Sequence, residues 1–134
     1  MKRARLNFTI ALAAFCAACV HQAGEAVEPI FLDDTGYAGD IYWASVGASG
    51  GQQCDRELGD AAQQAFERYF EGRVERVMNA YEARYGPAVE FIVPTICRRW
   101  SGSDAAFFRE KREQRREFAL WLERVEVGIA SWED

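Results

Sequence analysis

Four cysteines and one histidine are the residues with the most restrictive chemistry in this chain. Cys54 and Cys97 lie in its middle, and two such cysteines in an oxidising compartment most simply form one disulfide. Closing the loop between them would stabilise the fold by about 4 kcal/mol in the chain-entropy view. An intermolecular bridge and free thiols are the alternatives. We therefore predict a Cys54–Cys97 disulfide, with the two Cα atoms within about 7 Å of each other.

The single histidine, His21, lies near the N-terminus, in a segment that we predict to be removed. If cleavage follows Ala26, His21 is lost, and the mature chain has no Ser-His-Asp triad, no Cys-His pair and no histidine-ligated zinc ion. Catalysis would then have to use carboxylates, Tyr, Arg or Ser alone. Among the carboxylates, Glu90 lies in an apolar run. A carboxylate enzyme needs a second acid across a cleft, and the sequence indicates none. We predict no catalytic residue, and a carboxylate-based hydrolase is an alternative.

Asp33, Asp34 and Asp40 are close enough in the sequence to suggest calcium, which prefers oxygen ligands. Their spacing does not match an EF-hand, and Asp beside Gly is typical of turns. We therefore predict turns at these positions, with no metal and no cofactor.

Residues 1–26 have the order of an export signal, with a basic start, an apolar run over residues 6–20 and small residues before the end. The basic residues are Lys2, Arg3 and Arg5. The apolar run has about 15 residues, fewer than the roughly 20 of a membrane-spanning helix. Cleavage after Ala26 would release the mature chain into the periplasm.

A second way of processing is indicated by Ala17-Ala18-Cys19, which resembles the end of a bacterial lipoprotein signal. In that family the cysteine is lipidated and becomes the new N-terminus. Cys16 stands where the family normally has Leu. The resemblance implies a lipid anchor at Cys19 and a place at the outer membrane, and the Cys16-x-x-Cys19 spacing then belongs to targeting rather than redox chemistry.

The chain is acidic, with a formal net charge of −5 at pH 7. Nucleic acid binding needs a basic surface that contacts phosphates, so nucleic acid is not expected as a partner. A protein or an envelope polymer is the expected partner, and contact with a membrane is expected only through a lipid at Cys19.

The mature chain divides into an irregular arm over residues 27–57 and a helical domain over residues 58–134. Short apolar runs at residues 30–32 and 41–43 alternate with Gly and Asp, which is typical of two short strands or an extended arm. The Gly-rich stretch 47–51 is expected to be a flexible link.

The helical domain is expected to contain two long amphipathic helices. Apolar residues at helical spacing predict one helix over residues 58–85, with a bend or a close contact at Gly72. Ser and Asp around position 103 predict the start of a second helix over residues 104–128. Residues 88–97 suit either a short helix or an extended run. The predicted fold class is therefore mainly α, with one disulfide.

The second helix contains a polar run over residues 109–117, in which Lys111 and Arg115 interrupt the apolar stripe. Buried polar groups need partners, so we expect these side chains to be exposed or paired, and the helix to meet the core at its ends. The run is either solvated or a charged docking surface. Tyr42 and Trp43 are further candidates for partner contacts, because Tyr and Trp dominate interface energetics.

Together these features predict an exported bacterial cell-envelope protein that is a non-catalytic binding or structural module. One alternative is a periplasmic inhibitor or immunity-type protein that inserts a loop into an enzyme, with residues 33–51 as the candidate loop. The other is the carboxylate-based hydrolase described above.

Overall fold

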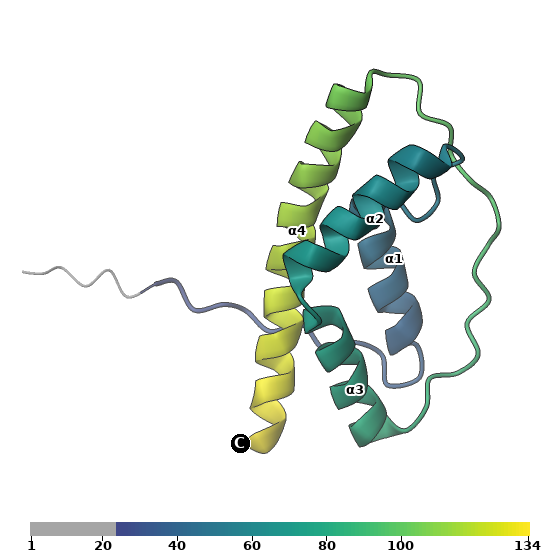
Figure 1. Cartoon of the computed structure of the whole chain (residues 1–134). Coiled ribbons are helices and arrows are strands. Elements are labelled where there is room, and N and C mark those ends of the chain that lie inside the picture. Colours follow the sequence, from purple (N-terminus) through teal and green to yellow (C-terminus); the bar gives the residue numbers. More distant parts are fainter. Residues whose placement is uncertain (1–23) are drawn as a thin grey trace, which may run out of the picture.

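The computed structural model describes residues 24–134, so Cys19, His21 and most of the predicted export signal lie outside the described residues. The described chain is mainly helical, as predicted. Its helices are α1 (Tyr37–Ser49), α2 (Arg56–Phe70), α3 (Arg73–Tyr85) and α4 (Asp104–Ala130), and a short 3-10 turn, η1 (Ser131–Glu133), follows. Figure 1 shows α4 along one side of the molecule, with the three shorter helices packed against it. Within residues 24–134, no helix is both long and apolar enough to span a bilayer.

Helix α1 corrects the prediction of an irregular or strand-forming arm. Its buried residues include Tyr37, Ile41 and Ala48, which lie on one face of a helix and pack against α4 and α2. The Tyr37 ring stacks on Tyr81 at 5.4 Å, and its hydroxyl donates to the carbonyl of Gly86 at 3.1 Å. Tyr81 and Gly86 are far from Tyr37 in the sequence. Contacts with such distant residues stabilise α1 as a helix, although its Gly-rich sequence has only a weak preference for helix.

The predicted single helix over residues 58–85 is in fact two helices. Glu71 and Gly72 both adopt left-handed backbone conformations, with φ of 46° and 77°, and the chain turns between α2 and α3. The prediction of an irregularity at Gly72 is therefore confirmed, but the prediction of one continuous helix is wrong. The turn lets the apolar faces of α2 and α3 reach the same core, through Phe66 and Phe70 on α2 and through residues such as Tyr81 on α3.

Helix α4 begins where it was predicted to begin, because the Ser103 hydroxyl accepts a hydrogen bond from the amide of Ala106 at 3.3 Å. Its apolar residues enter two separate clusters. Phe118, Leu122 and Val125 join the main core, whereas Phe107 joins a small cluster with Leu58 and Ala62 of α2. The polar run over residues 109–117 lies between the two clusters, so the helix meets the core at both ends of this run.

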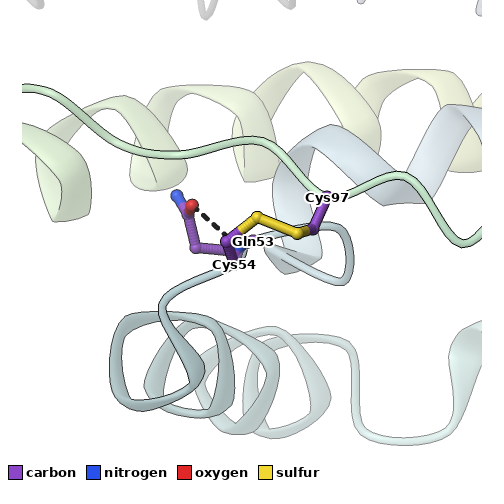
Figure 2. Close-up of a disulfide and its surroundings, with 3 residues drawn as sticks. All are labelled: Gln53, Cys54 and Cys97. Atoms are coloured by element: carbon purple, nitrogen blue, oxygen red, sulfur yellow. Dashed lines mark hydrogen bonds between the residues drawn. A yellow bond between two sulfur atoms is a disulfide. The ribbon is translucent and has the colours of Figure 1, made fainter.

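Residues 86–103, which we call the strap, join α3 to α4 without forming a helix. Figure 1 shows the strap as an extended loop beside α1, which settles the open choice for residues 88–97 in favour of the extended form. The predicted disulfide is confirmed, with the Cα atoms of Cys54 and Cys97 5.0 Å apart, and Figure 2 shows it joining the loop before α2 to the strap. Beside it, the amide of Arg98 donates to the carbonyl of Gln52 at 2.6 Å.

Candidate functional site

The contact between α1 and α4 leaves two neighbouring hollows. The first, the basic hollow, has a volume of about 160 Å³ and lies between the end of α1, the strap and α4. The second, the aromatic hollow, has a volume of about 340 Å³ and lies between α1 and α4 alone. Gly47 and Gln114 line both hollows, so the two form one continuous seam. Gln114 lies beside Gly47 of α1, at ordinary van der Waals distance from where a Cβ atom would be.

Lys111 is the cation that α4 contributes to the basic hollow. Its Nζ donates to the carbonyl of Gly47, and to Gln114 Oε1 at 3.0 Å. The Gln114 amide in turn donates to Glu110 Oε1 at 3.1 Å. Gly47 lies in the last turn of α1, where the helix dipole favours a positive charge. Lys111 is therefore held in place by two acceptors, as the sequence predicted for a polar residue on the apolar stripe.

Burial lowers the pKa of the Lys111 amine, and the positive charge of Arg98 lowers it further, whereas the charge of Glu110 opposes this. Desolvation disfavours the charged form of an amine unless an anion compensates it. Among residues 24–134, no carboxylate oxygen lies within 4.0 Å of a side-chain nitrogen of Lys111 or Arg98. The basic hollow thus holds two cations that have no ion-pair partner in the described part of the chain.

The strap contributes Arg98 and Trp100 to the basic hollow. The backbone of Arg98 is held against residues 52–54 by the bonds beside the disulfide. The Trp100 indole N–H donates to the carbonyl of Ser103 at 3.0 Å, and its ring packs edge-on against Phe107 at 5.4 Å. The sequence analysis did not single out Arg98 or Trp100. The one signal that pointed to them was the neighbouring Cys97, whose predicted bridge fixes this part of the strap.

The aromatic hollow contains Trp43, which was predicted as a partner contact. Trp43 is 49% exposed, and Trp121 of α4 lines the same hollow. Tyr42, the other predicted aromatic contact, instead packs on Trp43 and Phe91 at 5.2 Å each, and its hydroxyl accepts a hydrogen bond from Gln52. Trp43 therefore faces solvent, and Tyr42 supports it.

Arg115 lies apart from both hollows. It is half-buried, and its Nη1 atom is buried without a hydrogen-bond partner among the described residues. Burial lowers the pKa of its guanidinium, as does the neighbouring charge of Arg112. The structure therefore brings two of the predicted contact residues, Trp43 and Lys111, to one seam and leaves Arg115 elsewhere.

The strap offers a second exposed apolar surface. Ile92 is 82% exposed and Ile96 is 81% exposed, and Val89 and Val93 are also exposed. Residues 88–97 make no backbone–backbone hydrogen bond with the described chain. Phe91 is the exception among the apolar side chains, because its ring packs against Tyr42 and Trp43.

The acidic residues that were considered for calcium or for catalysis are not gathered into a site. Asp33 accepts hydrogen bonds from the hydroxyl and amide of Thr35 and from the amide of Gly36, which lowers the pKa of its carboxyl. It forms the turn before α1, as predicted, whereas the turn predicted at Asp40 is wrong because Asp40 lies in the first turn of α1. Glu90 is exposed on the strap. Among residues 24–134, no three His, Cys, Asp or Glu side chains are grouped closely enough to hold a metal ion.

Comparisons of the chain with protein-family models, with curated proteins and with solved structures find no significant match.

Proposed function

We propose that this chain is an exported protein of the bacterial cell envelope that binds a protein or an envelope polymer and does not catalyse a reaction. The order of basic, apolar and small residues over positions 1–26 supports export. The Cys54–Cys97 disulfide supports an oxidising compartment, since such bonds persist there and are rare in the cytosol. Anchoring at the outer membrane through Cys19 and release into the periplasm after Ala26 are the two forms of this proposal.

The seam between α1 and α4 is the proposed binding surface. The observation that carries this assignment is the exposed Trp43, which shares a hollow with Trp121 and continues into a second hollow lined by unpaired cations. Tryptophan contributes strongly to binding because it buries a large apolar area and keeps a polar N–H. A surface that combines exposed tryptophan with cations suits a partner that is both apolar and acidic.

Mass spectrometry of the protein recovered from its bacterial host tests the export step. We expect a chain that begins at Val27, or one that begins with a lipidated Cys19. A Cys19→Ser change should remove the lipid only in the second form. Recovery of a soluble cytoplasmic protein with an intact Met1 would contradict export.

The binding step is tested by capture of envelope proteins and polymers on the immobilised chain. We expect Trp43→Ala to reduce capture at least tenfold, a loss typical of an interface residue that contributes more than about 1.4 kcal/mol. Leu120→Ala is the matched control, because Leu120 is an apolar residue of α4 that is even more exposed than Trp43 and lines neither hollow. Equal capture by both variants would remove the seam from the proposal.

An inhibitor that blocks an enzyme is a second candidate function, but the predicted insertion loop must change. Most of residues 33–51 form the packed helix α1, whereas the strap is extended, apolar and fixed at Cys97. Ile92→Asp and Ile96→Asp should then abolish the capture of one enzyme in a 1:1 complex, while Trp43→Ala should not. The opposite pattern favours binding through the seam.

A further inference from the structure

We propose that the basic hollow binds an organic carboxylate that is carried on an apolar or aromatic body. This inference rests on the proposed function, because it names the class of ligand that one end of the seam would take. It is argued from the hydrogen bonds of Lys111, the charges that line the hollow and the rings that form its wall.

Lys111 has a proton left for a ligand. Its ammonium group has three N–H donors, and the described chain provides two acceptors, the carbonyl of Gly47 and Gln114 Oε1. These bonds hold the amine in the lining of the hollow. A half-buried charge without a counter-charge costs free energy, and an anion in the hollow would remove that cost.

The charge of the lining favours an anion over a neutral ligand. Two cations, Lys111 and Arg98, line the hollow together with one carboxylate, Glu110. Glu110 Oε1 already accepts a hydrogen bond from Gln114. The remaining single positive charge matches one carboxylate, and a guanidinium beside an ammonium provides the donors that a carboxylate accepts.

The wall of the hollow favours an apolar body on that carboxylate. The half-buried Trp100 ring lines the hollow and packs edge-on against Phe107, which is fully buried behind it. The bond from the Trp100 indole to Ser103 fixes the orientation of this ring. Aromatic rings bind apolar groups at little cost in conformational entropy, because they have few rotatable bonds. The hollow has a volume of about 160 Å³ and is open to solvent on one side, so it can take a carboxylate and part of its apolar body while the rest of the ligand lies outside. This chemistry is found both in a free aromatic acid and in the C-terminal residue of a peptide.

The test uses the full chain and two matched probes, N-acetyl-L-phenylalanine and its neutral amide, with binding followed by chemical shifts and calorimetry. We expect the acid to bind and the amide to bind at least tenfold more weakly. Equal binding of the two probes, or no binding of the acid at millimolar concentration, would overturn the proposal. Displacement of the acid by an equal concentration of inorganic phosphate would also overturn it, because the hollow would then select charge alone.

Variants of the cations locate the binding. Lys111→Met should weaken the acid at least tenfold, whereas Arg112→Met, which removes an exposed arginine next to it on α4, should leave the affinity unchanged. If Lys111→Met does not fold, Arg98→Met provides the same test on an exposed side chain of the strap. Equal weakening by Arg112→Met would place the acid outside the hollow.

The pH dependence gives an independent measurement. The carboxylate binds the protonated amine, and the pKa of Lys111 lies below its usual value of 10.5 in the free protein. Affinity should therefore fall as the pH rises toward 10.5, while the guanidinium of Arg98 keeps its charge. In Lys111→Met this fall should disappear, which a purely structural role of the lysine would not produce.

One further comparison distinguishes a free acid from a peptide C-terminus as the natural ligand, and another distinguishes this inference from the proposed function. A tetrapeptide that ends in phenylalanine should bind more tightly with a free than with an amidated C-terminus if the natural ligand is a chain terminus, whereas a free acid as ligand predicts that only the single residue binds. If the acid binds but Trp43→Ala still captures envelope material, the seam is removed from the proposed function and this inference stands. If the acid does not bind but Trp43→Ala loses capture, this inference fails and the proposed function stands.

Discussion

Two glycines in helices have opposite surroundings, although both are small residues in a regular backbone. Gly128 of α4 is buried against the N-terminal arm, by which we mean the described residues before α1 (24–36). A methyl group at Gly128 would overlap the carbonyl oxygen of Ile30 in this arm. The arm is fixed at this point, since the amide of Ile30 donates to the carbonyl of Arg124 at 2.9 Å. Gly47 of α1 has room, because a methyl group there would lie 3.8 Å from Gln114.

We expect Gly128→Ala to destabilise the protein by about 2–3 kcal/mol, as overpacking against a fixed backbone does. Gly47→Ala is the matched control and should stabilise the protein by about 0.5–1 kcal/mol, because alanine in a helix loses less backbone entropy than glycine. Urea unfolding of the two variants measures both changes. A neutral Gly128→Ala would show that the arm can move away from α4.

The outcome at individual residues of the seam shows what a sequence can predict. Trp43 was predicted as a contact residue from its residue type and Lys111 from a gap in an apolar stripe, and both are local features of the sequence. Arg98 and Trp100 were not predicted, because their positions depend on the disulfide and on the path of the strap. The expectation that Arg115 is exposed or paired is wrong, because its Nη1 atom is buried without a hydrogen-bond partner among the described residues.

At the scale of elements, the turn between α2 and α3 determines whether both helices can share one core. Glu71 and Gly72 are left-handed in succession, a conformation that costs a residue with a side chain about 1–2 kcal/mol. Glycine carries this conformation without that cost, whereas Glu71 does not.

Gly72→Ala should therefore destabilise the protein by about 1–2 kcal/mol, and Glu71→Gly should stabilise it by up to about 1 kcal/mol. Thermal unfolding measures the change in stability of each variant. Changes of opposite sign at these adjacent positions would show backbone strain, whereas a turn that tolerates no substitution would lose stability in both variants. Loss of stability in both variants would mean that the Glu71 side chain matters more than its backbone.

Helices α4 and α1 show why some elements were predictable and others were not. Helix α4 has its own cap at Ser103 and an apolar stripe at helical spacing, so its start and its length follow from nearby residues. Helix α1 contains Gly39 and Gly47, has no side-chain cap bond and is stabilised by contacts with α2, α3 and α4. Its buried apolar residues Tyr37, Ile41 and Ala48 do have helical spacing. The Gly and Asp residues between them, however, are typical of an extended arm.

At the scale of the whole molecule, the Cys54–Cys97 bond joins the loop before α2 to a strap that otherwise has few fixed points. The two cysteines are 43 residues apart in the sequence. A loop of this size gives an entropic stabilisation of about 4 kcal/mol in the folded state, because the bond restricts the unfolded chain.

The double change Cys54→Ser and Cys97→Ser should lower the free energy of unfolding by about 2–4 kcal/mol. The helices should remain, because their core contacts do not include either cysteine. Denaturant unfolding with circular dichroism measures both quantities, and the wild-type chain under reducing conditions should match the variant. A variant as stable as the oxidised protein would show that the strap is held without the bond.

The strap also lies outside the helical body, exposed along most of its length, and the bond holds its far part to the loop before α2. A protease in the envelope that cuts the peptide backbone between residues 88 and 96 would divide the chain into two fragments. The sulfur bridge would still join them, because Cys54 belongs to the first fragment and Cys97 to the second. Such a nicked protein would keep all four helices in one covalent molecule, and the cut would release two new chain ends without separating the halves.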